Sequence, residues 1–313
     1  MNTLVSVVVT TKNEEKNIRT CLQSICAQTW GEIETIVVDN SSDDATCSIA
    51  SEFTTNVYTR GPERSAQRNF GMIEKASGDY VIYVDADMIL SRTLIEACVR
   101  YIGGSEAIAL HIPETILGTR YLSKVRRFER GFYDGTVVDG ARFFNRSIFS
   151  SVGGFDEELF KKGSGEDWDI DKKIKRVGKI DYLPKKFIRS DDIPWPLEDF
   201  VRNGGVTYDK DYAGLYHNEE EFRLVPYIKK KAYYSAGFEG YIKKWGVSDP
   251  DVARQFGFGY RYWTVFTENG KWKRLMSRLD FAVGMYFLRI CVGVVFLMKV
   301  FMKFNAAEKI NNS

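Results

Sequence analysis

The first hundred residues alternate between short apolar runs and segments with apolar residues at helical spacing. Continuous apolar runs rich in β-branched residues are typical of strands buried on both faces of a parallel sheet. The runs are Leu4 to Val9, Thr35 to Val38, Val57-Tyr58 and Tyr80 to Val84, and the helical segments between them are residues 13–26, 44–53 and 65–76. Asn13 is the expected N-cap of the first helix. The pattern predicts an α/β fold with a doubly wound, mostly parallel sheet.

After residue 100 the pattern becomes mixed. We expect a strand over residues 141–144, a short helix over residues 147–152 and then a glycine turn. Gly165 precedes a predicted helix whose first turn is acidic, which suits the helix dipole. Ile170, Ile174 and Val177 share one face of this helix. Residues 185–214 are rich in Asp, Pro and Gly with little periodicity, so we expect a long loop there.

Polar side chains follow three of the predicted strands. Thr11, Asn13 and Glu14 follow the first strand, Asp39 and Asn40 the second, and Asp85 and Asp87 the fourth. Ligands of such sheets bind at the carboxyl ends of the strands, so we expect these side chains to converge. An Asp-x-Asp sequence by itself is common in solvated loops. Here the two carboxylates can share a divalent cation and leave its other positions open to phosphate oxygens.

Charge is divided unevenly along the chain, although the total is only +2. Residues 1–222 carry 28 basic and 36 acidic side chains, a net −8, which argues against nucleic-acid binding. Residues 223–304 carry 15 basic and 5 acidic side chains, a net +10, and interleave cations with aromatic rings. They include an apolar run over residues 281–302, interrupted by Arg289 and Lys299. We expect contact with an anionic membrane surface, with this run spanning the bilayer, lying on it or packing as a core helix.

The cysteines point to a compartment. There are five, with no CxxC pair or metal-like spacing, so we expect buried free thiols in a reducing environment. They are Cys21, Cys26, Cys47, Cys98 and Cys291. No basic stretch precedes the first apolar run, so we expect no cleaved signal peptide. The predicted location is the cytoplasmic face of the membrane.

Five segments together carry a family signature. They are residues 7–15 (VVVTTKNEE), residues 37–44 (VVDNSSDD), residues 68–71 (RNFG) leading to 78–80 (GDY) and 85–87 (DAD), residues 153–157 (GGFDE) and residues 165–168 (GEDW). In order and spacing they resemble the inverting family 2 glycosyltransferases of the GT-A fold, and the resemblance covers about residues 4–220. Each motif is weak alone, and the ordered set is specific.

The resemblance implies roles for individual residues. The residues implied in nucleotide binding are Thr11, Asn13, Glu14, Asp39, Arg68 and Asp85, and those implied in binding a Mn²⁺ or Mg²⁺ ion are Asp85, Asp87 and His217. Asp167 would be the catalytic residue, and Glu166 and Trp168 would contact the sugar. Within this set Asp39 would read the base, and His217 belongs to a His-Asn-Glu element found in some members. A lone histidine is as often structural. Lys12 and Asn40 depart from the family pattern, which leaves the donor open between a UDP- and a GDP-sugar.

The chemistry explains why these residue types are needed. The leaving group of a sugar nucleotide is a diphosphate, and a divalent cation neutralises the charge that develops on it. An acceptor hydroxyl is a poor nucleophile, so a carboxylate, here Asp167, takes its proton during attack. Attack opposite the leaving group inverts the anomeric centre. The competing interpretation is that Glu166, Asp167 and Asp169 only cap a helix.

The chain is therefore predicted to have two parts. Residues 1–220 are the catalytic domain, with a nucleotide-binding half over 1–100, an acceptor half over 101–220 and an insertion at 185–214. Residues 221–313 are a basic helical extension with the membrane-associating segment 281–302. The expected reaction adds one sugar, non-processively, to a membrane-presented acceptor, a polyprenyl-diphosphate-linked glycan. The alternatives are a polyprenyl-phosphate sugar synthase, whose acceptor is the lipid phosphate, and a catalytically inactive sugar-nucleotide-binding protein.

Overall fold

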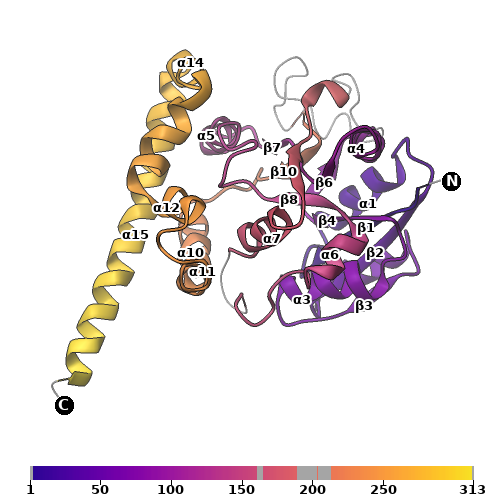
Figure 1. Ribbon diagram of the computed structural model, residues 1–313, viewed down its shortest axis with the longest axis horizontal. Coiled ribbons are helices and arrows are strands. Elements are labelled where there is room, and N and C mark those ends of the chain that lie inside the picture. The colour runs from indigo at the N-terminus through magenta and orange to yellow at the C-terminus, as the bar shows by residue number, and fades with distance from the viewer. Residues whose placement is uncertain (1–2, 161–164, 189–202, 204–212, 312–313) are drawn as a thin grey trace.

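A central sheet of seven strands, in the order β3-β2-β1-β4-β8-β6-β9, organises the computed structural model (Figure 1). The structure describes residues 3–160, 165–188, 203 and 213–311, with side chains as far as residue 298. The strands are β1 (Val5–Thr11), β2 (Ile33–Asp39), β3 (Val57–Thr59), β4 (Tyr80–Asp85), β6 (Ala107–His111), β8 (Ala141–Asn145) and β9 (Lys179–Tyr182). The first four pair in parallel, and β8 is antiparallel to both β4 and β6. The predicted mostly parallel α/β sheet is confirmed.

A smaller sheet of three strands adjoins the first, in the order β5-β10-β7. Its strands are β5 (Met88–Leu90), β7 (Glu114–Leu117) and β10 (Leu215–Asn218). Strand β5 begins directly after the Asp85-Ala86-Asp87 segment, and His217 on β10 pairs with Met88. This sheet therefore brings a residue from the far side of the predicted insertion next to the acidic pair. The insertion, residues 185–214, lies almost wholly outside the described residues.

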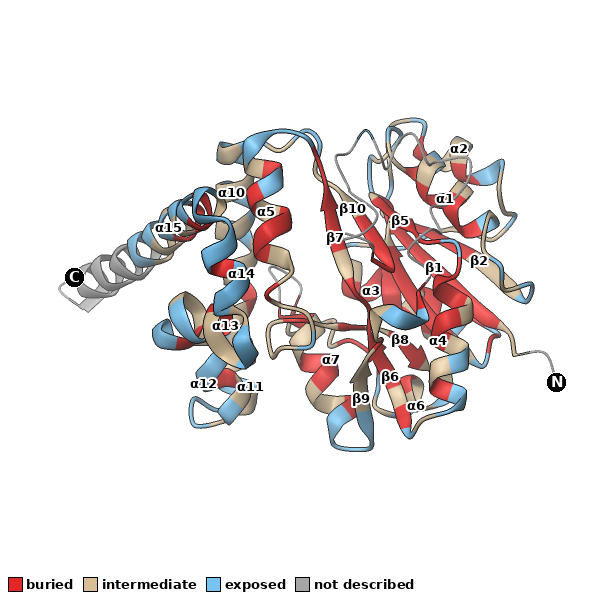
Figure 2. Cartoon of the chain, turned by 90° about the horizontal axis from the view of Figure 1, so that it is seen from above, coloured by how far each residue is buried: buried red, intermediate tan, exposed pale blue. Residues whose placement is uncertain are grey.

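Helices cover both faces of the large sheet (Figure 2). On the catalytic part they are α1 (Ile18–Cys26), α2 (Thr46–Ser51), α3 (Arg64–Asn69), the π-helix η1 (Phe70–Lys75), α4 (Leu94–Gly103), α5 (Tyr121–Arg130), α6 (Arg146–Ser151), α7 (Glu166–Lys175) and the 3₁₀ turn η2 (Lys185–Phe187). One apolar core joins the strands to α1 and α4, and a second joins them to η1, α6 and α7. All seven residues of β1 are buried, as expected for a strand between two such layers.

The C-terminal third is helical and stands beside the sheet (Figure 1). Its elements are α10 (Leu224–Tyr234), η3 (Ser235–Gly237), α11 (Phe238–Trp245), α12 (Pro250–Phe256), η4 (Tyr260–Thr264), α13 (Val265–Thr267), η5 (Glu268–Gly270), α14 (Trp272–Ser277) and α15 (Leu279–Asn311). Helix α15 packs on α5, and a third apolar core forms between them, with Phe128, Phe132 and Met285 among its buried residues. Tyr241 and Trp168 belong to a further cluster that joins α11 and α12 to α7.

Three local predictions are wrong. Asn13 is not an N-cap: its φ is 54°, a left-handed conformation that interrupts a helix, and α1 begins only at Ile18. Val177 lies beyond the end of α7 and its side chain is 58% exposed, because the helix stops before the turn into Gly178. Of the five cysteines predicted to be buried, only Cys21 and Cys98 are; Cys26, the last residue of α1, is exposed, and Cys47 and Cys291 are partly buried.

Candidate active site

A cavity of about 580 Å³ opens at the carboxyl ends of β1 and β4. Its lining comes from the ends of these strands, from β8, from the small-sheet strands β5, β7 and β10, and from helices α3, α5, α7 and α10. Of the predicted site residues, the lining includes Thr11, Glu14, Arg68, Asp85, Asp87, Asp167, Trp168 and His217. The described structure therefore gathers residues that are more than 200 positions apart in the sequence, as the convergence of strand ends predicts.

Arg68 connects the two sides of this cavity. Its guanidinium is 2% exposed and donates through Nη2 to Asp85 Oδ1 at 3.2 Å and through Nη1 to Asp167 Oδ1 at 3.0 Å. The Tyr83 ring lies 4.0 Å from its central carbon, a cation–π contact. Burial alone would raise the pKa of Asp85, but the charges of Arg68 and Arg142 hold it well below its usual range. Asp85 therefore stays ionised at neutral pH, and both carboxylates accept from one planar cation.

Asp167 lies in the first turn of α7, where two donors fix its carboxylate. Tyr83 donates its hydroxyl to Asp167 Oδ1 at 2.9 Å, in addition to Arg68. The side chain remains 39% exposed and faces the cavity. Gly140 makes this approach possible, because a Cβ there would lie 2.8 Å from the Cβ of Asp167. An oriented and accessible carboxylate has the geometry of a general base.

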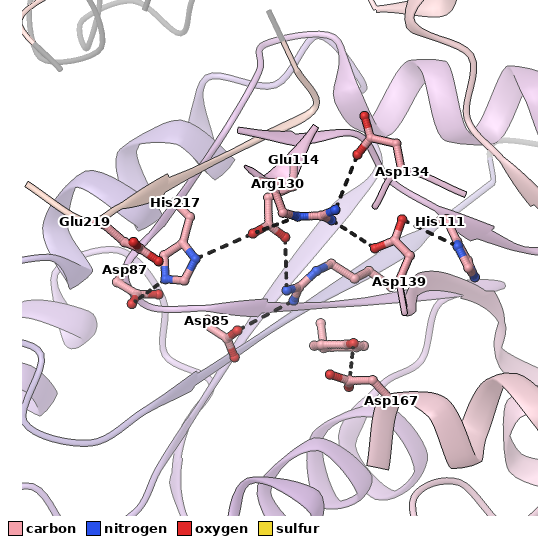
Figure 3. Close-up of polar contacts among 12 residues, drawn as sticks. Asp85, Asp87, His111, Glu114, Arg130, Asp134, Asp139, Asp167, His217 and Glu219 are labelled. Carbon is pink, nitrogen blue, oxygen red and sulfur yellow. Dashed lines mark hydrogen bonds and ion pairs between the residues drawn. The ribbon is translucent and has the colours of Figure 1, made fainter. Parts of the chain in front are cut away.

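Asp87 and His217 form the other end of the cavity (Figure 3). The imidazole Nε2 lies 2.9 Å from Asp87 Oδ2, and Nδ1 lies 3.5 Å from Glu114 Oε1. Asp87 Oδ1 is buried and has no hydrogen-bond partner in the described part of the chain. The orphaned Asp87 oxygen suits a divalent cation. Burial lowers the pKa of His217, but Asp87 and Glu114 raise it overall, so the imidazole can join the carboxylate as a metal ligand only after it loses a proton. No group of three or more His, Cys, Asp or Glu side chains in the described ranges is arranged around a metal position, so phosphate and water would have to complete the coordination.

Glu166 and Trp168 flank Asp167 and have different surroundings. Glu166 is buried and pairs with Arg64 Nε at 2.6 Å, and burial together with the charge of Asp167 raises its pKa. Trp168 lines the cavity, and its ring stacks on Phe238 of α11 at a centroid distance of 5.5 Å. Glu166 thus anchors the helix start, whereas Trp168 connects the cavity to the C-terminal helices.

Two predicted nucleotide-binding residues do not line the cavity. Asp39 is 1% exposed, and its carboxylate accepts the backbone N–H of Ser42 at 2.7 Å. Asn13 accepts the backbone N–H of Asp43 through its side-chain oxygen at 3.1 Å. Thr11 and Glu14 do line it, and the buried Thr11 hydroxyl has no partner in the described residues. Asp39 and Asn13 therefore support the loops beside the cavity, and their roles in nucleotide binding stay predictions.

A charged network leads away from His217 into the molecule (Figure 3). Glu114 contacts His217, Arg142 at 3.3 Å and Arg130 at 3.6 Å. Arg130 also forms an ion pair with Asp139, with 2.9 Å between Nη2 and Oδ1. Asp139 lies 3.6 Å from the second histidine, His111, whose other nitrogen lies 2.7 Å from Asp171 on α7. The network joins the strand that carries His217 to the helix that carries Asp167.

Sequence reasoning missed several residues of the site. Arg142 interrupts a predicted apolar strand and lies 3.6 Å from Asp85 Oδ2, so a cation in a buried strand was the available signal. No local sequence pattern marks Glu114 as a site residue, because only its contacts in the folded structure do so. Arg126, Tyr227, Lys230, Lys231 and Tyr234 also line the cavity. The last four belong to a segment whose mixture of cations and aromatic rings suggested only a membrane surface.

Comparison with known proteins agrees with this geometry. Residues 6–155 match the model of "Glycosyl transferase family 2". The chain is 34% identical over 97 residues to the uncharacterized glycosyltransferase YibD of Escherichia coli, a match over 29% of this chain and 28% of that protein. It is 25% identical over 228 residues to the O-antigen chain rhamnosyltransferase WbaN of Salmonella anatum, over 63% and 71% of the two chains. The match spans only about a third or less of several other curated relatives.

Solved structures share the fold. The mannosyltransferase PcManGT from Pyrobaculum calidifontis, in complex with GDP-Man and Mn²⁺, superposes with a TM-score of 0.53 at 15% identity, covering 99% of this chain and 81% of that one. S. aureus TarS 1-349 with UDP-GlcNAc superposes with a TM-score of 0.50 at 17% identity, over 94% and 89%. The predicted GT-A architecture is confirmed.

Proposed function

We propose, from the match of residues 6–155 to the model of glycosyl transferase family 2, that the protein transfers one sugar from a UDP- or GDP-sugar to a membrane-presented acceptor. The transfer inverts the anomeric centre, and the acceptor is a polyprenyl-diphosphate-linked glycan. The observation that carries the proposal is the bridge from Asp85 through Arg68 to Asp167. It holds a donor-side carboxylate and an acceptor-side base at fixed positions on one cavity.

Asp87 and His217 are the residues that would hold a Mn²⁺ or Mg²⁺ ion, together with the donor diphosphate. When bound, such an ion offsets the negative charge that develops on the leaving diphosphate. The fit rests on the orphaned Asp87 oxygen and on the adjacent imidazole. The carboxylate of Asp85 pairs with Arg68 and Arg142. Its proposed role is therefore to orient the donor beside these cations rather than to bind the metal ion by itself.

Asp167 is the proposed general base. Its Oδ1 is held by Arg68 and Tyr83, which leaves Oδ2 to accept the proton of an acceptor hydroxyl. The ring of Trp168 borders the same space and offers an apolar surface for a sugar ring. With the base fixed on α7 and the donor fixed at the strand ends, the hydroxyl attacks the face opposite the leaving group. That geometry produces inversion.

Helix α15 supports a membrane-presented acceptor. It is the one helix within the described residues that is long and apolar enough to cross a membrane, with a mean hydropathy of 2.2 over Leu279–Met298. Only 28% of that window is buried. Its large exposed apolar side chains recur at helical spacing and form a stripe, which consists of Leu279, Val283, Phe287, Ile290, Val294, Leu297 and Met298. Arg289, in contrast, is buried and donates to Glu129 at 2.7 Å.

The position of Arg289 favours a helix that lies on the membrane. A spanning helix would have to expose this guanidinium to lipid or keep α5 attached inside the bilayer, and both are costly. A helix at the interface keeps the pair with Glu129 and immerses the apolar stripe. We therefore propose peripheral attachment, with the cavity above the cytoplasmic leaflet.

A donor screen tests the proposal. The purified chain is heated with UDP- and GDP-sugars, with and without Mn²⁺ or Mg²⁺, because a ligand of the native state raises the midpoint of unfolding. We expect a metal-dependent rise with one donor, followed by transfer of its sugar to a detergent-solubilised polyprenyl-diphosphate glycan. Binding without transfer to any acceptor would favour the inactive binding protein, and no rise with any donor would reject the donor site.

A further inference from the structure

Helix α10 forms one wall of the cavity. Four of its side chains line the space, Tyr227, Lys230, Lys231 and Tyr234, whereas the adjacent Lys229 does not. The spacing places these four on the side of the helix that faces the strand ends. A helix outside the family-matched region thus contributes two lysines to the cavity.

These lysines differ from the arginines of the cavity. Arg64, Arg68, Arg126 and Arg142 each form ion pairs with carboxylates within 4 Å. No carboxylate of the described residues lies within that distance of Lys230 or Lys231. Instead they lie over aromatic rings: the Lys230 ammonium is 5.8 Å from the Tyr234 ring, and the Lys231 ammonium is 5.5 Å from the Tyr227 ring.

The surroundings of Lys231 strengthen the contrast. Arg126 lies over the same Tyr227 ring, at 5.1 Å, so two cations share one ring beside the cavity. Burial and the charge of Arg126 lower the pKa of Lys231 to about 7. Arg126 is already paired with Glu129 and Glu219, whereas Lys231 has no carboxylate of the described residues within 4 Å, so an anion that enters the cavity can pair with Lys231. Lys230, in contrast, interacts electrostatically with Asp87 and Asp85, so this lysine lies on the donor side of the cavity.

We propose that Lys230 and Lys231 form a phosphate-binding pair in the catalytic cavity. The proposal rests on the proposed function, because it names the chemistry that one wall of that same site recognises. Ammonium groups are point-charge donors suited to phosphate oxygens, and the two tyrosines beside them add hydroxyl groups that can donate. The phosphate belongs either to the donor diphosphate or to the phosphate that links an acceptor to its lipid.

Neutral variants of adjacent lysines test the pair. Lys230→Gln, Lys231→Gln and the double variant are compared with Lys229→Gln, which removes the same charge from the same helix outside the cavity. Calorimetric titrations with inorganic pyrophosphate measure the site without any nucleotide. We expect about a tenfold or greater loss of pyrophosphate affinity in the double variant, as for the loss of charge-assisted hydrogen bonds, and none in Lys229→Gln. Lys230→Arg/Lys231→Arg should retain most of the affinity, which separates charge from folding.

Two further arms identify the source of the phosphate. Titration with UDP and GDP in the presence of Mg²⁺ reports on the donor, and titration with farnesyl diphosphate at saturating nucleotide reports on a lipid-linked acceptor. Weakened nucleotide binding assigns the pair to the donor, and weakened farnesyl diphosphate binding alone assigns it to the acceptor. Pyrophosphate binding that is absent in the wild type or equal in the double variant overturns the inference. Pyrophosphate binding that depends on the lysines, without any nucleotide binding, would instead reject the proposed donor.

Discussion

Arg68 shows how one residue ties stability to chemistry. Its buried guanidinium pairs with Asp85, Asp167 and Glu166, and the first two of these carboxylates also line the cavity. A buried cation with a partner removed costs several kcal/mol, so these carboxylates cannot be removed without consequence for the fold. Substitutions that keep the shape and change only charge are therefore the informative ones at this scale.

Asp167→Asn is the first such substitution. The amide retains the volume of the carboxylate but cannot accept a proton, so kcat for transfer to a hydroxyl acceptor should fall by ~10² to 10⁴, with donor affinity little changed. Asp156→Asn is the matched control, because Asp156 contacts Lys244 outside the cavity. An acceptor that is already ionised needs no base. A retained rate with a polyprenyl phosphate would therefore favour the sugar synthase over the glycan-extending enzyme.

His111 gives a prediction about pH. Burial lowers its pKa, but Asp171 and Asp139 raise it overall, to about 10 against an ordinary value of 6.5. Because the folded state binds this proton more tightly, the stabilisation is fully present below about pH 6.5 and is lost as pH rises toward 10. We expect wild type to lose more than ~1 kcal/mol of unfolding free energy relative to His111→Gln between pH 6.5 and 9.5, measured by urea titration. A pH-independent difference would contradict this assignment.

At the scale of elements, α15 is held to the catalytic part by a buried polar contact as well as by packing. Arg289 donates to Glu129 and to the backbone carbonyl of Arg261, and it does so within the apolar stretch of the helix. Glu129 also forms an ion pair with Arg126, with 2.9 Å between Oε2 and Nη1. The docking of α15 on α5 therefore depends on one cation in an otherwise apolar segment. Gly284 permits the close approach, because a Cβ there would lie 2.7 Å from the Tyr121 hydroxyl oxygen and Val125 Cγ2.

Arg289→Met tests that dependence. The substitution leaves Glu129 buried with one cation fewer, and removing one partner of a buried pair typically costs ~3–5 kcal/mol. We expect a lower midpoint in urea and faster proteolysis of α15, with partial recovery in Arg289→Met/Glu129→Gln. Arg278→Met, which loses an exposed pair with Asp280, should leave both measurements almost unchanged. Equal behaviour of the two single variants would show that packing alone docks the helix.

The elements near the N-terminus could be predicted because local pattern determines them. Strands β1, β2 and β4 have continuous apolar runs, and polar residues at their ends converge wherever parallel strands share a sheet. The role of α10 could not be predicted. Its cations and rings suit a membrane interface as well as a cavity wall, and only tertiary contacts distinguish them. Glu114 was missed for the same reason, since its contacts with Arg130, Arg142 and His217 are all made across the fold and leave no local signature.

At the scale of the whole molecule, charge and apolar surface are segregated in the same direction. The acidic catalytic part carries the cavity, and the basic C-terminal part carries the apolar stripe of α15. Further exposed rings and apolar chains lie on neighbouring elements, and they are Phe258, Trp263, Trp272 and Met276. Cations adjoin them at Lys273 and Arg278. Aromatic rings and cations around an apolar stripe are the features of an interfacial helix.

Vesicle binding tests this orientation. The chain should sediment with vesicles of equimolar phosphatidylcholine and phosphatidylglycerol, less with phosphatidylcholine alone, and less at high salt because screening weakens the attraction to anionic lipid. Val283→Asp/Ile290→Asp replaces two exposed stripe residues and should lower the partition coefficient at least about tenfold, since burying each apolar side chain contributes ~1.5–3 kcal/mol. Val177→Asp/Val247→Asp changes two equally exposed residues elsewhere and should leave binding unchanged.

Carbonate extraction distinguishes a helix α15 that lies on the membrane surface from one that spans the bilayer. A peripheral helix held by Arg289 and Glu129 should be released from native membranes by alkaline carbonate, whereas a spanning helix should stay with the bilayer. Arg289→Met sharpens the comparison, because it removes both the contact with α5 and the charge that opposes insertion. If α15 lies on the surface because of that contact, the variant should resist carbonate extraction more than wild type does. Resistance in the wild type itself would mean that the pair with Glu129 opens at the membrane and that the helix inserts.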